Sequence, residues 1–241
     1  MNRQNKRKLI LIIAVLLFPV TLLYLSPALP IESAFLGIIN GSILVFIALL
    51  IGSIFLGRLF CAYLCPGGGI QECAFLVQNK TPKKGRRYFI KYVVWIVMIA
   101  GTVIAHILNT KPVTIDFFFA TENGISVHNM FYYMIYYVII LLILLPALIS
   151  GKRAFCHYIC WMAPFMVTGI KIRRALRLPG VFVSHSSENC NSCKRCSMVC
   201  PMSLDMEEIT TNGAVTNSEC IQCGNCIDNC PKKSLSYSLK K

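Results

Sequence analysis

Residues 190–201 read Cys190-Asn191-Ser192-Cys193-Lys194-Arg195-Cys196-Ser197-Met198-Val199-Cys200-Pro201. The same pattern, C-x2-C-x2-C-x3-C-P, returns from Cys220 to Pro231, with every cysteine displaced by 30 residues. Structural zinc sites also favour thiolates at C-x2-C spacing. Zinc, however, explains neither the third cysteine of each run nor the proline after the fourth. The spacing is instead that of the ligands of two [4Fe–4S] clusters.

The two runs predict two ligand sets that exchange their last members. In two-cluster bacterial ferredoxins, three cysteines of one run hold one cluster and the fourth ligates the other. The first set is Cys190, Cys193, Cys196 and Cys230. The second set is Cys220, Cys223, Cys226 and Cys200. Because such clusters carry single electrons, we expect the chain to bind iron through these cysteines and to take part in electron transport.

The chain before the cysteine runs has the composition of a membrane protein. Hydrophobic residues make up 56% of the 241 residues, and charged residues only 14%. Four stretches approach or exceed the roughly 20 apolar residues that cross about 30 Å of hydrocarbon. They are Leu9–Leu25, Ala34–Phe60, Phe89–Leu108 and Met130–Ile149. We expect each to form a transmembrane helix, with Pro19 kinking the first.

The sequence thus predicts an α-helical membrane protein with two domains. Residues 1–179 would form a domain of four transmembrane helices, and residues 180–241 an α+β two-[4Fe–4S] ferredoxin domain of the bacterial type. Between the two cysteine runs, residues 209–216 predict a β-hairpin around an Asn-Gly turn. Lys171–Arg177 is expected to be a basic surface segment that leads into the ferredoxin domain.

The net charge of +14 lies entirely in residues 1–179 and is unevenly distributed. Of the basic residues there, 17 fall on the side that holds both termini, and Lys111 alone falls on the other. Positive charge marks the cytoplasmic side of membrane proteins, which predicts a multi-pass protein of the cytoplasmic (inner) membrane with both termini and the ferredoxin domain in the cytoplasm. The charges lie at helix ends, where lipid head groups would meet them, so the expected partner is the bilayer and not a nucleic acid. The 17 residues are Arg3, Lys6, Arg7, Lys8, Arg58, Lys80, Lys83, Lys84, Arg86, Arg87, Lys91, Lys152, Arg153, Lys171, Arg173, Arg174 and Arg177.

Two matching stretches close the second and fourth predicted helices. They read Phe60-Cys61-Ala62-Tyr63-Leu64-Cys65 and Phe155-Cys156-His157-Tyr158-Ile159-Cys160. The two helix pairs therefore form a two-fold pseudo-repeat about an axis along the membrane normal. If each C-x3-C keeps a helical pitch, its two cysteines share one face.

The two C-x3-C pairs together supply four thiolates, the number that an iron–sulfur cluster requires. They predict a third cluster, either [4Fe–4S] or [2Fe–2S], held by Cys61, Cys65, Cys156 and Cys160. The alternative is a set of packed or free thiols, because an unligated cysteine behaves as a small hydrophobic residue.

Three ionisable or reactive residues outside these motifs, His106, Cys73 and Lys91, have separate expected roles. His106 is the only histidine in a predicted span, which predicts a quinone or proton role unless the side chain merely faces the head groups. Cys73 has no spaced partner and is expected to be a packed thiol. Lys91 is expected to extend to the membrane surface. The sequence contains no glycine-rich phosphate loop and no Ser/His/Asp arrangement, so no catalytic residue is predicted.

The combination of four spans, twin C-x3-C motifs and a C-terminal two-cluster ferredoxin resembles the NapH/NosR-type 4Fe-4S membrane proteins. The most specific parts are Cys61–Pro66, Cys156–Cys160 and the two ferredoxin runs. Family members often carry C-x3-C-P at both repeats, whereas Trp161 follows Cys160 here. The resemblance implies the electron-transfer (quinol dehydrogenase) subunit of a respiratory chain, which commonly passes electrons from quinol towards an extracytoplasmic reductase.

Three functions therefore remain open. The first is an electron relay between the iron–sulfur clusters, the quinone pool and an extracytoplasmic redox protein, such as a multihaem cytochrome, a ferredoxin-type subunit or a flavin subunit. The second is a maturation factor that reduces a metal, for example copper, for a respiratory enzyme. The third is a thiol–disulfide exchanger that uses the C-x3-C cysteines, which a reducing cytoplasm disfavours.

Overall fold

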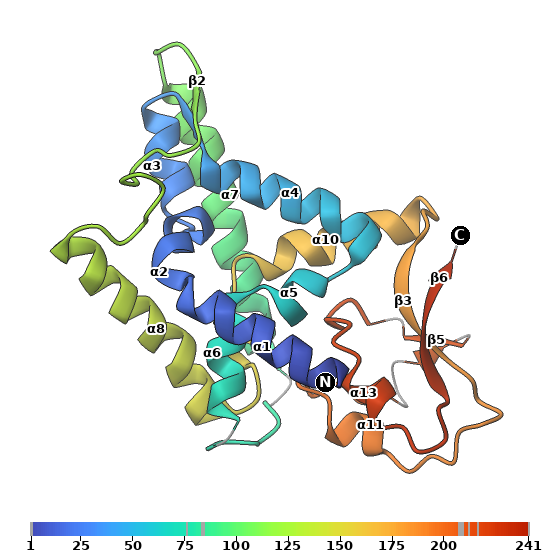
Figure 1. Ribbon diagram of the computed structural model, residues 1–241. Coiled ribbons are helices and arrows are strands. Elements are labelled where there is room, and N and C mark those ends of the chain that lie inside the picture. Colours follow the sequence, from blue (N-terminus) through green and yellow to red (C-terminus); the bar gives the residue numbers. More distant parts are fainter. Residues whose placement is uncertain are drawn as a thin grey trace.

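The structure is a computed structural model that describes residues 2–75, 77–82, 85–206, 210–211, 213–215 and 217–240 (Figure 1). Its N-terminal part is helical. The helices are α1 (Arg3–Leu16), α2 (Phe18–Thr21), η1 (Leu23–Leu25), α3 (Leu29–Phe35), α4 (Gly41–Leu56), α5 (Leu59–Tyr63), α6 (Pro66–Ala74), η2 (Arg86–Phe89), α7 (Ile90–Leu108), α8 (Met130–Ser150), α9 (Ala154–Tyr158) and α10 (Ala163–Ala175). Two short strands, β1 (Ile38–Asn40) and β2 (Thr114–Asp116), pair in parallel.

The third and fourth predicted spans are single helices, α7 and α8. They are the two helices within the described residues that are long and apolar enough to cross a membrane. The first predicted span is not one kinked helix, because α1 ends at Leu16 and α2 starts again at Phe18. Pro19 stands in the first turn of α2, where its missing N–H costs nothing, so it marks a break and not a bend.

The second predicted span is interrupted as well. Gly37 has a φ of 76°, a left-handed conformation that suits glycine, and the chain then forms β1. The carboxamide of Asn40 accepts a hydrogen bond from the backbone N–H of Ile43 at 3.0 Å and caps the start of α4. The apolar helix that follows has only 16 residues. The prediction of four transmembrane helices therefore overstates the length of the helices in the first half of the chain.

The short helices after the two C-x3-C motifs pack reciprocally. α6 of the first repeat packs against α8, and α10 of the second repeat packs against α4. The rings of Phe46 on α4 and Phe165 on α10 stack with centroids 5.1 Å apart. A Cβ on Gly169 would collide with Ser53, so a glycine is needed where α10 crosses α4. The short helix of each repeat thus packs against the long helix of the other, and this packing brings the two C-x3-C motifs together.

The basic segment Lys171–Arg177 is not a surface linker throughout, contrary to the prediction. Most of it belongs to α10, and Arg173 is only 8% exposed. The Arg173 guanidinium donates a hydrogen bond to the carbonyl of Val181 at 2.9 Å. The segment therefore connects the helices to the first strand of the C-terminal part.

The C-terminal part is built on a four-stranded sheet with the order β4-β5-β3-β6. β3 (Gly180–His185) and β6 (Leu235–Lys240) pair in antiparallel fashion along their whole length. β4 (Thr210–Thr211) and β5 (Ala214–Val215) form the predicted hairpin, while Ile209, Asn212 and Thr216 of that prediction lie outside the described residues. Two short helices, α11 (Arg195–Met198) and α13 (Asn225–Asp228), follow the two cysteine loops.

The sheet domain docks against the start of α1 and the ends of the motif segments (Figure 1). Arg3 forms an ion pair with Asp228 at 2.7 Å. Gln4 donates a hydrogen bond to the carbonyl of Cys223 at 3.1 Å, and Lys152 donates one to the carbonyl of Met198 at 3.1 Å. The ferredoxin loops therefore face the part of the helical domain that carries the C-x3-C motifs.

Candidate iron–sulfur site

The structure brings each predicted ferredoxin ligand set to one cavity. Cys190, Cys193, Cys196 and Cys230 line the first cavity. Cys200, Cys220, Cys223 and Cys226 line the second. The crossed arrangement is thus present in the fold, with the fourth cysteine of each run beside the first three of the other.

The loops around the two cavities share their backbone conformation. Left-handed φ angles occur at Ser192 and Lys194 of the first loop, and at Gln222 and Gly224, which lie 30 residues later. Such residues let a short loop curl so that several side chains or amides point to one centre. The two cavities are therefore built to hold groups of the same kind.

The two ferredoxin cavities differ in their exposure. Cys190 and Cys193 of the first set are exposed, whereas Cys223 and Cys226 of the second are only 7% and 8% exposed. Burial raises the pKa of Cys220 to about 12 and that of Cys200 to about 11. Thiolates in such surroundings need a bound cation, which the iron of a cluster supplies. The first centre would be the outward end of the domain and the second its inward end.

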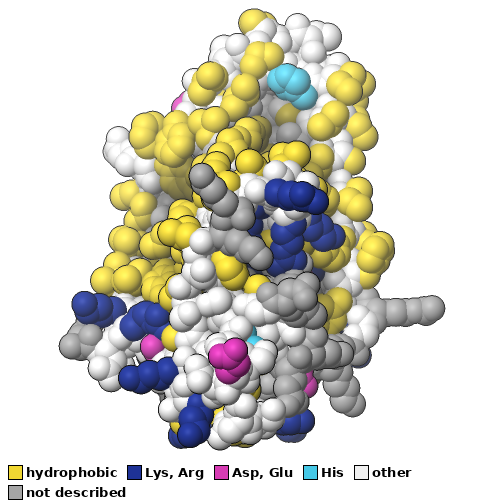
Figure 2. Space-filling model, turned by 90° about the vertical axis from the view of Figure 1, so that its right-hand side faces the viewer, with side chains coloured by type: hydrophobic (Ala, Val, Ile, Leu, Met, Phe, Trp, Pro, Cys, Tyr) yellow, Lys and Arg dark blue, Asp and Glu magenta, His cyan; other side chains and the backbone are white. Residues whose placement is uncertain are grey.

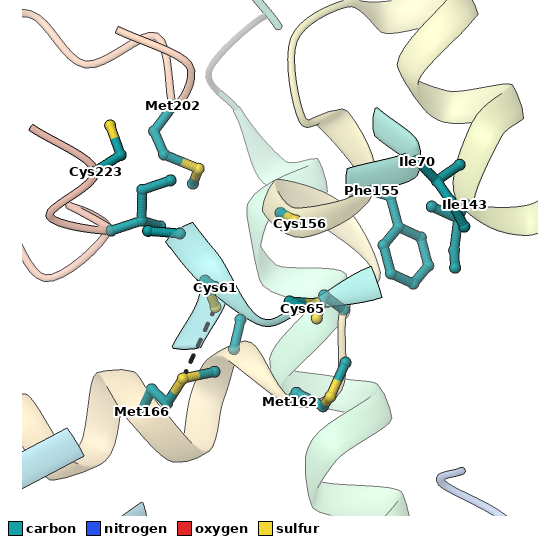
Figure 3. Packing of buried hydrophobic residues seen from close by; sticks show 14 of the residues in the cluster. Cys61, Cys65, Ile70, Ile143, Phe155, Cys156, Met162, Met166, Met202 and Cys223 are labelled. Carbon is teal, nitrogen blue, oxygen red and sulfur yellow. Dashed lines mark hydrogen bonds between the residues drawn. The ribbon is translucent and has the colours of Figure 1, made fainter. Parts of the chain in front are cut away.

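The four cysteines of the C-x3-C motifs gather in the core of the helical domain. Cys61, Cys65, Cys156 and Cys160 are each no more than 4% exposed. Figure 3 shows Cys61, Cys65 and Cys156 close together among the buried hydrophobic residues. Burial, followed by the nearby thiols of Cys61 and Cys156, raises the pKa of Cys65 to about 12. We call these four residues the cysteine tetrad.

The cysteines of each motif do not share one continuous helix, so the condition of a helical pitch is not met. α5 ends at Tyr63, and Cys65 precedes the first residue of α6. The backbone N–H of Cys65 donates to the carbonyl of Phe60 at 3.0 Å, and that of Cys160 donates to Phe155 at 3.0 Å. The same turn therefore occurs in both repeats and presents both cysteines of each motif to the core.

Neighbouring side chains fix the sulfur atoms of the tetrad. The Gln71 carboxamide donates to the sulfur of Cys156 at 3.0 Å and accepts from the backbone N–H of Phe155 at 3.1 Å. The Met166 sulfur lies 3.8 Å from that of Cys61 (Figure 3). A Cβ on Gly68 would lie 3.0 Å from the carbonyl of Cys61, so the close approach of α6 to α5 requires glycine.

The donor set of the tetrad is four cysteine thiols, the set that an iron–sulfur cluster takes as ligands. Each ferredoxin cavity is likewise lined by four cysteines. Within the described ranges, no group of three or more His, Cys, Asp or Glu side chains is already arranged around a single ion.

Buried ion pairs surround the tetrad, and the sequence did not predict them. Glu72 pairs with Arg7 at 2.6 Å and with Arg153 at 2.5 Å. Glu219, the residue before Cys220, pairs with Arg58 and Lys91 at 2.6 Å each. Burial would raise the pKa of Glu219, but Arg58 and Lys91 outweigh it and lower this pKa to about 2. Lys91 thus points to the ferredoxin domain and not to the membrane surface.

One sequence signal could have revealed two of these residues. Arg58 and Arg153 each stand three residues before the first cysteine of their motif. The matching position in a repeat of otherwise hydrophobic residues sets them apart from the cations of the basic loops. Glu72 and Glu219 carry no such signal, because neither has an acidic counterpart at the matching position of the other repeat or of the other cysteine run.

The remaining histidine and cysteine predictions have different outcomes. His106 is exposed in the last turn of α7, about 22 Å along the helix from Lys91, so the structure does not bring it to the cysteines. Cys73 is exposed, and the expectation of a packed thiol is wrong. His157 is completely buried beside Cys156, and burial lowers its pKa to about 4, so the ring is neutral at pH 7.

Comparisons with known proteins agree with the positions of these cysteines. The chain matches the 4Fe-4S binding domain family over residues 41–84 and 133–179, which hold the two C-x3-C motifs. It matches the 4Fe-4S dicluster domain family over residues 182–231, which hold the two ferredoxin runs. No solved structure matches the chain.

Several relatives resemble most of the chain at low identity. The putative electron transport protein YccM of Escherichia coli is 24% identical over 229 residues, which cover 83% of this chain and 56% of YccM. The ferredoxin-type protein NapH of Haemophilus influenzae is 23% identical over 216 residues, 85% of this chain and 69% of NapH. An uncharacterised protein of Methanocaldococcus jannaschii is 25% identical over 200 residues, 80% of this chain and 76% of its own length.

Proposed function

The chain belongs to the NapH-type family of 4Fe-4S proteins, and from this we propose that it is a membrane-bound electron relay between cytoplasmic [4Fe–4S] clusters and the quinone pool. In this proposal the two ferredoxin cavities and the cysteine tetrad each hold an iron–sulfur cluster. The relay would exchange electrons with an extracytoplasmic redox protein. That exchange would take place either through the quinone pool or by direct contact with the chain.

The order of the three cysteine sets is the observation that carries the proposal. Two cysteines of the first ferredoxin set are exposed, those of the second are half-buried or buried, and all four of the tetrad are buried in the core of the helical domain. Glu219 precedes Cys220 of the second set and pairs with Arg58, whose guanidinium lies 3.9 Å from the sulfur of Cys61. An electron could therefore pass from the surface to the tetrad through adjoining sites.

The surface of the helical domain supports a place in the membrane. Of the most apolar 18-residue windows of α7 and α8, only 17% and 11% are buried within the protein, so these are not the core helices of a soluble domain. In Figure 2, hydrophobic side chains dominate the upper part of the visible face, and Lys and Arg gather in its middle and lower parts. Cations beside the ferredoxin domain favour a cytoplasmic location for that end.

A mobile carrier would explain how electrons leave the tetrad. The four cysteines lie at the ferredoxin end of α7, which is about 28 Å long. An apolar cavity of about 550 Å³ opens between α4, α5 and the sheet. Met166 lines it and also contacts Cys61, and Tyr63 and Tyr237 bring phenol groups to its wall. Its size and mostly apolar lining suit a quinone ring.

Exchange of electrons with a quinone analogue tests this function. The full chain would be purified without oxygen, reduced with dithionite and placed in lipid vesicles. Adding menadione should then reoxidise the clusters, which EPR spectroscopy would follow. Clusters that stay reduced while remaining fully loaded with iron would contradict the quinone link and leave the iron–sulfur assignment standing.

A further inference from the structure

Arg58 and Arg153 occupy equivalent positions in the two repeats and are completely buried. Each stands three residues before the first cysteine of its motif, and each side chain has an exposed fraction of 0%. A guanidinium is rarely buried without partners, because the loss of hydration is large. The structure must therefore supply acceptors for five N–H bonds at each arginine.

The terminal nitrogens of both arginines have partners around the tetrad. Arg58 pairs with Glu219 at 2.6 Å and places its other terminal nitrogen 3.9 Å from the sulfur of Cys61. Arg153 donates to the carbonyl of Cys61 at 2.8 Å and pairs with Glu72 at 2.5 Å. Both cations are thus fixed beside the cysteines by acids that belong to other segments.

The Nε–H groups of the two arginines differ from the terminal nitrogens in their hydrogen bonding. Among the residues that the structure describes, neither Arg58 Nε nor Arg153 Nε has a hydrogen-bond partner, although both atoms are buried. Buried donors in native proteins are almost always satisfied, and an unsatisfied charged donor carries the full cost of desolvation. Two such donors at matching positions beside the same thiols indicate an acceptor that belongs to a bound group.

The electrostatics around the two guanidinium groups agree with this. Burial alone would lower the pKa of each arginine. Glu219 and the thiols of Cys61 and Cys156 instead raise the pKa of Arg58, and Glu72 with the same two thiols raises that of Arg153. Both guanidinium groups therefore remain positively charged beside the tetrad.

We propose that Arg58 and Arg153 donate their Nε–H groups to sulfur atoms of the cluster in the tetrad and thereby raise its reduction potential. This inference rests on the proposed function, since it requires a cluster on the four cysteines. Reduction adds one electron, and hence one negative charge, to the cluster. Hydrogen bonds and fixed positive charge stabilise that added charge, and both are known determinants of cluster potential.

Arginine-to-lysine variants separate the Nε–H group from the positive charge. Lysine keeps the cation that pairs with Glu219 or Glu72 but has no Nε–H in that place. Arg58→Lys and Arg153→Lys would be made in the full chain, purified without oxygen and titrated against ambient potential by EPR. Arg7→Lys is the matched control, because Arg7 also pairs with Glu72 but directs its Nε to Gln4 at 2.8 Å.

Each of the two variants should lower the reduced-to-oxidised ratio of the tetrad cluster about tenfold at a fixed ambient potential, which corresponds to about 59 mV for one electron. The ferredoxin clusters and the Arg7→Lys protein should keep their potentials. An unchanged tetrad potential in variants that retain their iron would overturn the inference.

A measurement on the unaltered protein covers the case in which a variant loses iron. Chains with ¹⁵N at arginine Nε would be reduced and examined by electron spin-echo spectroscopy. A ¹⁵N coupling to the tetrad cluster is expected, and its absence would overturn the inference. If the wild-type protein contains iron for the two ferredoxin clusters only, the proposed cluster on the tetrad is absent, and the inference is overturned together with that part of the proposed function.

Discussion

Glu72 is the residue at which α1, α6 and the second motif meet. Its side chain is only 12% exposed and pairs with Arg7 and Arg153. Burial would raise its pKa, but the two arginines lower it below the ordinary value. The carboxylate therefore stabilises the folded protein by balancing two buried cations.

Replacing Glu72 by Gln should destabilise the helical domain by about 3–5 kcal/mol, because it leaves two buried arginines without their counter-charge. Thermal unfolding in detergent would measure the loss. Arg3→Gln removes one partner of an ion pair that is 33% exposed on both sides, so it should change the stability by no more than about 1 kcal/mol. Equal losses in the two variants would contradict the role of Glu72.

The same carboxylate predicts a dependence of stability on pH. Its folded pKa is depressed, so its contribution is complete above the unfolded pKa of about 4.3 and is lost as the pH falls towards the folded pKa. The wild type should therefore lose stability below about pH 4 more steeply than Glu72→Gln. Thermal unfolding of both proteins across this range checks the sign, and parallel curves would contradict it.

Helix α4 forms one wall of the proposed quinone cavity. Gly52 lines that cavity, and a Cβ built on it would meet no atom within 4 Å. A larger side chain there would fill the cavity without displacing the protein, and replacing glycine within a helix also favours the helix.

Gly52→Leu should consequently block electron exchange with menadione at least tenfold while the iron content and the EPR spectra stay unchanged. Gly52→Ala is the matched control, since a single methyl group leaves most of the cavity open and should leave the rate close to that of the wild type. The rate of cluster reoxidation in lipid vesicles measures both. Normal exchange in Gly52→Leu would place the quinone elsewhere.

Some features of the fold could be predicted from the sequence, and others could not. The grouping of the ferredoxin cysteines was predictable, because the spacing of each run encodes it and both cavities contain the expected sets. The breaks in the first two predicted spans were not, because hydropathy continues from Leu16 to Phe18 and across Gly37, whose φ of 76° leads the chain into β1. The Arg58–Glu219 pair joins residues 161 positions apart and appears only in the tertiary structure.

Two buried acids join three parts of the chain around the tetrad. Glu219 attaches the ferredoxin domain to Arg58 and to Lys91 of α7. Four of the seventeen cations that indicated the cytoplasmic side, Arg7, Arg58, Lys91 and Arg153, are therefore structural partners of Glu72 and Glu219. The predicted orientation therefore depends on the other cations, of which Lys83 and Lys84 lie outside the described residues.

Glu219→Gln should loosen the docking of the ferredoxin domain, because it leaves Arg58 and Lys91 buried without a carboxylate. The second ferredoxin cluster should then lose iron to a chelator about tenfold faster, because its cysteines are shielded in the docked state. A tenfold change is well below the limit set by the loss of about 3–5 kcal/mol that is expected when a buried ion pair is broken. Glu188→Gln, at an exposed position of the same domain, is the control. Equal rates of iron loss in the two variants would contradict the docking role.

A cluster on the cysteine tetrad would give the chain more iron than its two ferredoxin runs can bind, and the iron and acid-labile sulfide content per chain measures this. The wild-type protein should contain about twelve iron atoms if the tetrad holds a [4Fe–4S] cluster, or about ten if it holds [2Fe–2S]. The double variant Cys61→Ala, Cys156→Ala should contain about eight, and Cys73→Ala should match the wild type. The same content of about eight in the wild type and the double variant would mean that the tetrad holds no cluster.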